Sequence, residues 1–164
     1  MPHSSTPKYW LLLSIFVILG SNLIVHSAKA QQDGDCSMHA IGYLVGIPPE
    51  EVAARTGYMQ GPSHNESDIT DMMARLNIGN GMHPHFTSRQ AAYDYMNARN
   101  DGRDTYYIIA YIPPGEGVGH VIDARSSVAG SSRRLTFIDC QQLNNNEPPD
   151  NCPLYIVWFG RFLP

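Results

Sequence analysis

The chain has 164 residues, with 11 lysines and arginines against 15 aspartates and glutamates, which gives a formal charge of −4. This length is enough for one packed core and too short for two ordinary domains. The hydrophobic fraction of 43% argues against wholesale disorder, and the acidic balance argues against nucleic acid or an anionic membrane as the main partner.

Residues 1–30 are expected to form a secretory signal peptide. A mostly apolar run of 16 residues, Trp10–Val25, is followed by the small-x-small pattern Ala28-Lys29-Ala30, which predicts cleavage before Gln31. The alternative is an uncleaved membrane anchor, but the run falls short of the roughly 20 apolar residues that span a bilayer. The mature chain is then a single exported domain, residues 31–164, without a stable membrane anchor.

The mature chain contains no lysine, because Lys8 and Lys29 both lie in the predicted signal peptide. Nine arginines remain against fifteen acidic residues, which gives residues 31–164 a formal charge of −6. An arginine-favouring genome is one explanation. Selection against lysine, the residue that receives ubiquitin, is the other, and it would suit a protein that enters a eukaryotic cytosol.

Four helices are predicted in the first half of the mature chain. Proline and two acidic residues in the first turn favour a helix that starts at Pro49, and Ser67 and the Thr87–Gln90 box are typical of helix starts. The predicted ranges are Cys36–Val45, Pro49 to Gly57, Ser67 to Leu76, and Thr87–Gln90 to about Asn100–Gly102.

The second half of the mature chain changes to the pattern of strands, rich in β-branched and aromatic residues. Helices first and an antiparallel meander after them predict an α+β domain. The C-terminal run 153–164 is read as a last core strand rather than a docking tail. The predicted strands are Thr105–Ile112, Gly119–Ser126, Leu135–Cys140 and Leu154–Phe159.

The second and third predicted strands are expected to form a hairpin that brings His120 to Asp139. A turn centred on Ala129-Gly130 places these two residues directly opposite each other, with their side chains on one face. A carboxylate at that distance can fix the tautomer and orientation of an imidazole. The prediction depends on the register, because a one-residue slip sends the two side chains to opposite faces.

The chain has three cysteines, and an odd number in an exported protein predicts one disulfide and one free thiol, or an intermolecular bridge. Cys140 and Cys152 enclose a polar, turn-rich segment, and a bond between them would hold that loop. Cys140 also follows Asp139 and is expected to point to the opposite face of the strand. A Cys140–Cys152 disulfide is therefore predicted, with Cys36 free.

Cys36 is a candidate nucleophile because it begins a predicted helix, where the dipole and free backbone N–H groups stabilise an anion. With His120 as base and Asp139 as orienting group, it would form the set used by cysteine hydrolases. Cys36 could instead be a buried structural residue or an intersubunit bridge. A zinc site built from Cys36, His39 and the His83-Pro84-His85 segment is disfavoured, because no second cysteine pair accompanies it.

Three segments, DGDCSMHAIGYLVG, GHVIDA and FIDCQ, resemble in this order the papain-like toxin family of glutamine deamidases. The resemblance covers most of residues 33–142 and implies a papain-like cysteine hydrolase fold. It also implies that Cys36 is the nucleophile, His120 the general base and Asp139 the orienting residue, with Gln141 shaping the substrate site. Cys140 stands where the family often has proline. The Asp-Gly-Asp-Cys box is also similar to ovarian-tumour-type deubiquitinases, although Val121 replaces the aromatic residue that commonly follows their histidine.

The resemblance implies a secreted bacterial toxin that deamidates a glutamine side chain of a host protein without a metal or cofactor. A separate delivery or receptor-binding subunit is expected, since 134 residues leave little room for one in the same chain. The alternatives are a cysteine protease, a deubiquitinase or a transglutaminase-like acyl transferase with the same triad. A non-enzymatic secreted binding module with a structural Cys36 is the other class.

Overall fold

A computed structural model describes residues 35–61, 63–79, 82–98, 102–115, 119–141 and 146–160, all of which belong to one compact unit, Gly34–Pro164. The predicted signal peptide and its cleavage site lie outside the described residues. Within the described ranges, no helix has the length and apolar character needed to cross a bilayer.

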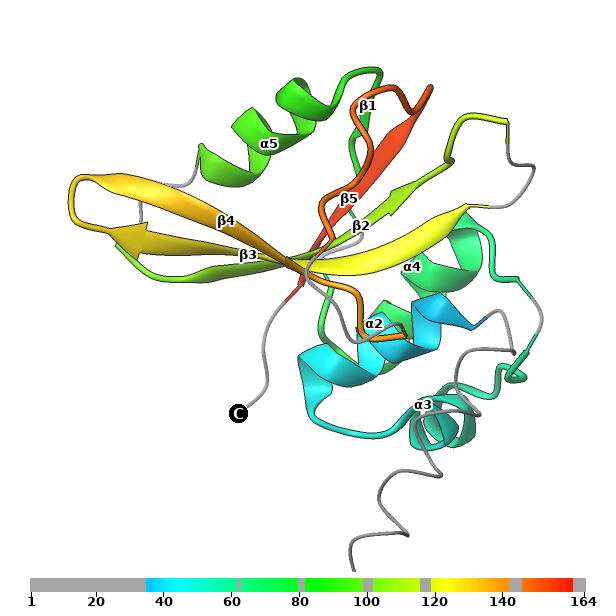
Figure 1. The fold of residues 1–164 in the computed structure, drawn as a ribbon. Coiled ribbons are helices and arrows are strands. Elements are labelled where there is room, and N and C mark those ends of the chain that lie inside the picture. The colour runs from blue at the N-terminus through cyan, green and yellow to red at the C-terminus, as the bar shows by residue number, and fades with distance from the viewer. Residues whose placement is uncertain are drawn as a thin grey trace, which may run out of the picture. The chain divides into compact units, whose positions relative to one another are not determined.

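The domain is α+β, as predicted (Figure 1). In the described part of the chain, three helices precede the antiparallel sheet, and a fourth helix follows the first, very short strand. The helices are α2 (Cys36–Val45), α3 (Pro49–Thr56), α4 (Glu66–Arg75) and α5 (Arg89–Asn97). The strands are β1 (His85–Phe86), β2 (Thr105–Tyr111), β3 (His120–Ala129), β4 (Ser132–Ile138) and β5 (Tyr155–Gly160).

The sheet order is β1-β5-β2-β3-β4, with every neighbouring pair antiparallel. The predicted meander is therefore correct only for β2, β3 and β4. The last strand crosses back to pair with β2, so that β5 lies inside the sheet and not at its end. This places the C-terminal strand in the core, in agreement with the strand expected there.

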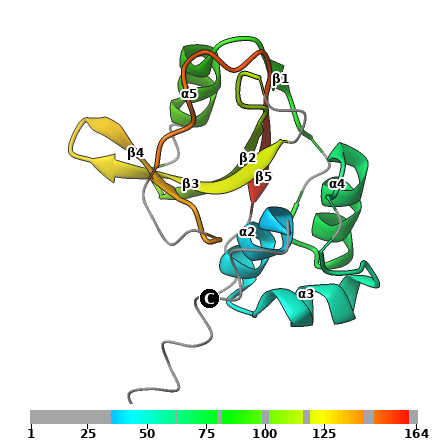
Figure 2. The same ribbon diagram turned by 45° about the vertical axis from the view of Figure 1, so that its right-hand side comes forward.

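The sheet is covered on both faces. Helices α2, α3 and α4 lie on one side and α5 on the other (Figure 2). Alternate residues of β2 serve the two faces, as the period of a strand requires: Ile108 packs with α2 and α4, whereas Tyr107 and Ile109 pack with α5. This double coverage explains why β2 reads as a nearly continuous apolar run.

Helix α2 has the predicted bounds, and it is built to lie flat on the sheet. Met38, Ile41 and Leu44 are fully buried at helical spacing. The helix ends at Gly46, whose left-handed φ of 69° carries the C-cap and whose N–H bonds the carbonyl of Gly42. The first residue of this buried helix is Cys36, so its position depends on the packing of the whole element.

The caps of the next two long helices differ from the prediction by one or two residues. Asn65, and not Ser67, caps α4: its side chain accepts from the Asp68 N–H while the Asp68 carboxylate accepts from the Asn65 N–H. Ser88, and not Thr87, caps α5 by accepting from the Ala91 N–H. The polar residues at each start compete for the same role, and tertiary packing decides among them.

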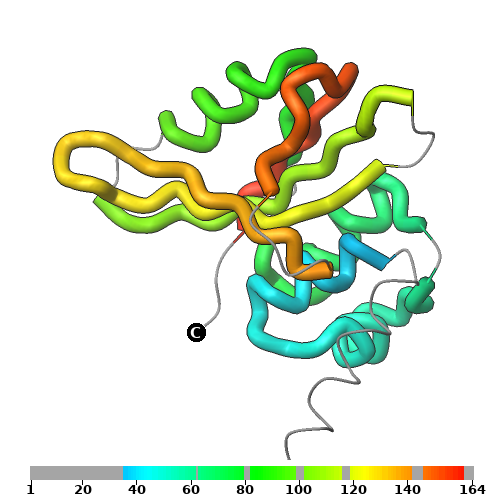
Figure 3. Tube along the Cα trace, in the orientation of Figure 1, coloured from blue at the N-terminus to red at the C-terminus, as the bar shows by residue number. Residues whose placement is uncertain are grey.

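The β3–β4 hairpin is long, and its turn differs from the prediction by one residue (Figure 3). Ala129 pairs with Ser132, so Gly130 and Ser131 form the turn, and Gly130 takes the positive φ of 64° that a tight hairpin needs. The predicted centre at Ala129-Gly130 is wrong. Because a shift of one residue in the turn centre moves each cross-strand partner by two residues, the same side chains stay on the same face.

Candidate active site

Cys36 occupies the first position of α2. The amides of Met38 and His39 bond the carbonyl of Asp35, at 2.9 and 3.2 Å, and thereby start the helical hydrogen-bond pattern. This leaves the amides of Cys36 and Ser37 at the open end of the helix, where an anion is favoured. The Cys36 side chain is partly exposed, whereas the residues on either side, Asp35 and Ser37, are buried.

His120 and Asp139 are brought together by the hairpin. His120 is the first residue of β3, and its Nε2 lies 2.6 Å from Oδ2 of Asp139, just beyond the end of β4. With the observed register, the two residues are diagonal neighbours on one face rather than directly opposite. The predicted contact is therefore present although the predicted register is wrong, because the corrected turn preserves the face.

The second oxygen of the Asp139 carboxylate, Oδ1, is also hydrogen-bonded. The backbone N–H of Gln141 donates to Oδ1 at 3.1 Å, and the Asp139 side chain is almost fully buried. Gln141 thus contacts the site through its backbone, and this backbone contact was not part of the prediction. The predicted role of its side chain in shaping the substrate site stays a prediction.

The Cys36 thiol lies close enough to His120 to contribute to the shift of the imidazole pKa. Because Nε2 of the imidazole contacts Asp139, Nδ1 is the ring nitrogen left to exchange a proton with the thiol. Burial alone would lower the pKa of His120, but its hydrogen bonds to Cys36 and Asp139 and their negative charges raise that pKa to about 9. An imidazole between two acidic groups is therefore favoured in its protonated form at neutral pH.

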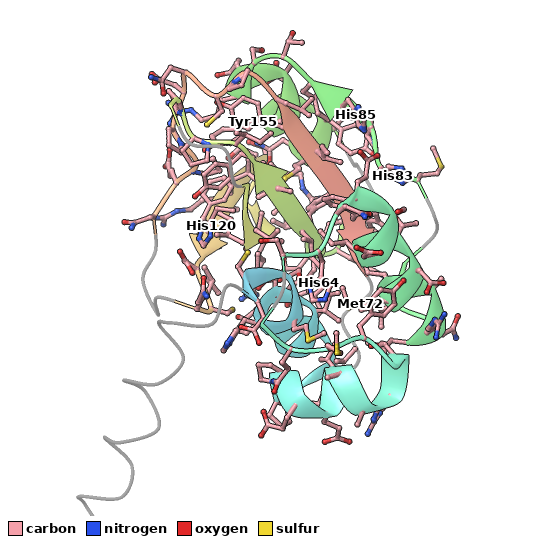
Figure 4. All side chains as sticks on the ribbon, turned by 90° about the vertical axis from the view of Figure 1, so that its right-hand side faces the viewer. His64, Met72, His83, His85, His120 and Tyr155 are labelled. Atoms are coloured by element: carbon pink, nitrogen blue, oxygen red, sulfur yellow. The ribbon has the colours of Figure 1, made fainter. Side chains whose placement is uncertain are left out.

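The His120 ring is supported by a neighbouring strand. Tyr111 of β2 is the register partner of His120, and the two rings meet edge-on with centroids 5.7 Å apart. Figure 4 labels His120 at the end of its strand. The imidazole is therefore oriented both by a carboxylate and by an aromatic neighbour, which restricts its rotation.

The predicted Cys140–Cys152 disulfide is wrong in this structure, where all three cysteines are free. Cys140 does point away from the face of Asp139, as expected, but its thiol donates to Oδ2 of Asp123 at 3.1 Å. Cys152 is buried in the core cluster on the α5 face, where its N–H donates to the hydroxyl of Tyr155. The Cys140 thiol and the buried Cys152 therefore lie among different neighbours.

Asp123 and Cys140 form a buried polar pair behind the site. Burial raises the pKa of the Asp123 carboxyl well above its usual value, and the nearby charge of Asp139 acts in the same direction. Burial and Asp123 raise the pKa of the Cys140 thiol as well. Both groups are therefore biased towards their neutral forms, which limits the negative charge buried beside Asp139.

The histidines of the disfavoured zinc site have other partners. His39 Nε2 lies 3.4 Å from Oδ1 of Asp35. His83 and His85 each place Nε2 against Oε1 of Glu66, at 2.8 and 2.7 Å. Among the residues that the structure describes, no group of three or more His, Cys, Asp or Glu side chains is arranged to hold a metal ion.

A pocket of about 150 Å³ opens beside Cys36. Its wall comes from the start of α2, from α4 and the segment before it, and from β2, β3 and β5. Its lining residues include Cys36, His64, Glu66, Ile69, Ile156 and Trp158. Of these residues only Cys36 could be assigned to a site from the sequence. No motif connects the others, because they come from separate helices and strands that only the fold brings together.

Ser37 connects helix α2 to the wall of the pocket. Its hydroxyl lies 2.8 Å from Nδ1 of His64, in the segment just before α4. His64 in turn meets Tyr58 edge-on, with ring centroids 5.7 Å apart. The residue next to Cys36 is therefore held against the pocket wall by a side-chain contact, which couples the positions of α2 and α4 at the site.

Comparison with models of known protein families finds no match, and comparison with curated proteins finds none either. The site is thus interpreted from its own geometry, which brings together the three predicted residues Cys36, His120 and Asp139 beside a pocket.

Proposed function

We propose that the protein is a papain-like cysteine hydrolase that deamidates a glutamine side chain of a host protein. The observation that carries the proposal is that Cys36, His120 and Asp139 lie together, with Nε2 of His120 2.6 Å from Oδ2 of Asp139 and the Cys36 thiol close enough to act on the imidazole pKa. This is the arrangement that nucleophilic catalysis by cysteine needs. The preference for glutamine comes from the resemblance of the three sequence segments.

In the proposed reaction, the thiolate of Cys36 attacks the carboxamide carbon of glutamine. The carbon–nitrogen bond breaks, and His120 gives its proton to the departing ammonia. Water then attacks the resulting thioester with His120 as the base, which releases glutamate and restores the thiolate of Cys36 and the protonated His120. The amides of Cys36 and Ser37 at the helix start are the candidate donors to the oxyanion in both steps.

The site supports the proposal through its charge balance. His120 is favoured as an imidazolium at neutral pH, so the proton that ammonia needs is already on the ring. Asp139 is held by His120 and by the Gln141 amide, so its role is to orient the ring and not to exchange protons. A solvent-facing lone cysteine without such partners would lack both features.

Export by a signal peptide and entry into a host cell with a separate delivery subunit belong to the same proposal. They rest on the sequence of residues 1–30 and on the absence of lysine from residues 31–164. A toxin that acts in the host cytosol would gain lifetime from having no lysine to ubiquitinate.

The proposal is tested by intact-mass spectrometry of host-cell proteins after exposure to the mature protein. Deamidation adds about one dalton per site, because an amide –NH₂ is replaced by –OH, and the Cys36→Ala variant should leave the masses unchanged. Cleaved or crosslinked host proteins would instead indicate the protease or the acyl transferase. No change with a folded wild-type protein, across lysates of several host types, would contradict an enzymatic function on proteins.

A further inference from the structure

The pocket beside Cys36 combines an apolar wall with one carboxylate. Ile69, Ile156 and Trp158 supply apolar surface, and Glu66 is the acidic residue among the described residues that line the pocket. No lysine or arginine is among the described lining residues. A ligand that fits this wall therefore meets the Glu66 carboxylate, whose described partners are the side chains of His83 and His85 rather than a lysine or an arginine.

Glu66 is held in a fixed position. It is the first residue of α4, one turn before Ile69, and its Oε1 faces Nε2 of both His83 and His85, at 2.8 and 2.7 Å. The His83 ring stacks on Trp158, with centroids 5.9 Å apart, and Trp158 is itself buried. Figure 4 shows His83 and His85 close to each other. Both contacts use Oε1, and no other described residue contacts Oε2, the oxygen that would face a ligand.

We propose that Glu66 is a specificity-determining residue that binds the cationic end of a lysine or arginine side chain next to the reacting glutamine. This inference rests on the proposed function of the site. A cavity of about 150 Å³ with an apolar lining holds a group the size of benzene, which is comparable to the methylene stem of lysine. The apolar wall suits the stem, and the carboxylate suits the charged head.

The charge of the molecule favours the same class of partner. Residues 31–164 carry nine arginines and fifteen acidic residues, so the mature chain attracts basic surfaces at long range. A substrate glutamine that lies beside a basic residue would thus be favoured both in the encounter and in the pocket.

The pocket is tested without substrate turnover by two thiol reagents that modify Cys36. One is the cationic trimethylammonium-ethyl methanethiosulfonate and the other is the neutral methyl methanethiosulfonate, with modification of Cys36 measured by peptide mapping. The ratio of cationic to neutral rate should fall about threefold in Glu66→Gln, since Glu66 is partly solvated. Glu66→Asp, which keeps the charge, should retain most of the ratio.

Glu50→Gln is the matched control, because Glu50 is an exposed residue of α3 and is not among the residues that line the pocket. It removes the same charge and should leave the ratio unchanged. An equal fall in Glu50→Gln and Glu66→Gln would assign the effect to net charge and overturn the proposal, as would an unchanged ratio in a Glu66→Gln protein whose circular dichroism matches that of the wild type.

The substrate preference is tested with peptides that carry lysine, norleucine or glutamate beside one glutamine. Wild-type kcat/KM should rank lysine above norleucine above glutamate, mainly through KM, and Glu66→Gln should lose the lysine preference. Deamidation without this ranking would refute the role of Glu66 and leave the deamidase intact. A Glu66-dependent reagent ratio without deamidation of any peptide would refute the deamidase and leave the cationic pocket in place.

Discussion

His120 lies between two acidic partners, and this decides how the site responds to pH. Its pKa in the folded protein is about 9, above the value of about 6.5 for an unfolded histidine. A raised histidine pKa gives stability that is fully present below about pH 6.5 and is lost as the pH rises through about 9. The imidazolium thus stabilises the fold in the same pH range in which it would protonate a leaving group.

The first prediction follows from this shift. Between pH 7 and pH 10 the free energy of unfolding of the wild type should fall by about 1–3 kcal/mol more than that of His120→Gln. Urea unfolding at a series of pH values measures the difference between the two proteins, which removes the titrations that they share. Parallel curves for the two proteins would mean that the proton on His120 contributes nothing to the fold.

The buried Asp123 carboxyl lowers the stability of the fold at neutral pH, whereas the imidazolium of His120 raises it. Burial raises the pKa of its carboxyl well above the usual value, so folding requires a proton on this group once the pH exceeds the unfolded value of about 3.9. The second prediction is that Asp123→Asn stabilises the protein more at pH 7 than at pH 4. Asp150→Asn, at an exposed position, should show no such difference. A larger gain at pH 4 would show that Asp123 is charged in the fold.

The three free cysteines give a third prediction. Thiol titration of the denatured, non-reduced protein should find three thiols, and the native protein should show one that reacts fast. Cys36 is partly exposed at a helix start, whereas Cys152 is buried and burial raises the pKa of the Cys140 thiol. A peptide that links Cys140 to Cys152 after oxidative folding would contradict the structure.

Helix α2 holds Cys36 in place, and the position of this helix depends on a glycine. A Cβ on Gly42 would lie 2.5 Å from the backbone oxygen of Ile47, an atom that cannot move aside without a shift of the chain. Gly42→Ala should therefore lower the free energy of unfolding by about 1–3 kcal/mol. Gly46→Asn is the comparison, since Gly46 has open space around it and asparagine tolerates its positive φ. Chemical denaturation measures both, and a smaller loss for Gly42→Ala would refute this fourth prediction.

The elements show what the sequence allows one to predict. The bounds of α2 and the presence of the four long strands follow from local signals: helical spacing, a left-handed glycine, and runs of β-branched and aromatic residues. The hairpin strands differ from their predicted ranges, since β3 runs on to Ala129 and β4 already begins at Ser132. The crossing of β5 to β2 does not follow from such signals, because strand order depends on contacts far apart in the chain. The two-residue strand β1 is too short to leave a periodic pattern.

In the site, too, the features that depend on local signals could be predicted and those that depend on distant contacts could not. His120 and Asp139 can be paired from the sequence because a hairpin turn is a local feature, and an error of one residue in its centre preserves the face. The odd cysteine count, the polar loop between Cys140 and Cys152 and the facing of Cys140 favour a disulfide, but none of them reveals that the Cys140 thiol has a partner in Asp123. The pocket with Glu66 could not be predicted, since it is assembled from helices and strands that only the fold brings together.

At the scale of the whole molecule, the absence of lysine from residues 31–164 gives a fifth prediction. Arg55→Lys and Arg134→Lys, at exposed positions, should leave catalysis unchanged in vitro. They should shorten the lifetime of the protein in a host cytosol, and a proteasome inhibitor should restore it. Arg75 is unsuitable for this test, because it bonds both Asp71 and the Thr56 carbonyl. Equal lifetimes for the arginine and lysine forms would favour the genomic explanation.

The central claim is that His120 activates Cys36 as a nucleophile, and the most direct test is the rate at which iodoacetamide alkylates Cys36 in the native protein near pH 6.5. We predict a rate at least about tenfold above that of Cys36 in the urea-unfolded protein, because an adjacent histidine and the backbone N–H groups at a helix start activate a cysteine nucleophile. His120→Ala should reduce the rate to near the unfolded value, and Asp139→Asn should reduce it less. A native rate equal to the unfolded rate, or one that His120→Ala leaves unchanged, would contradict the claim.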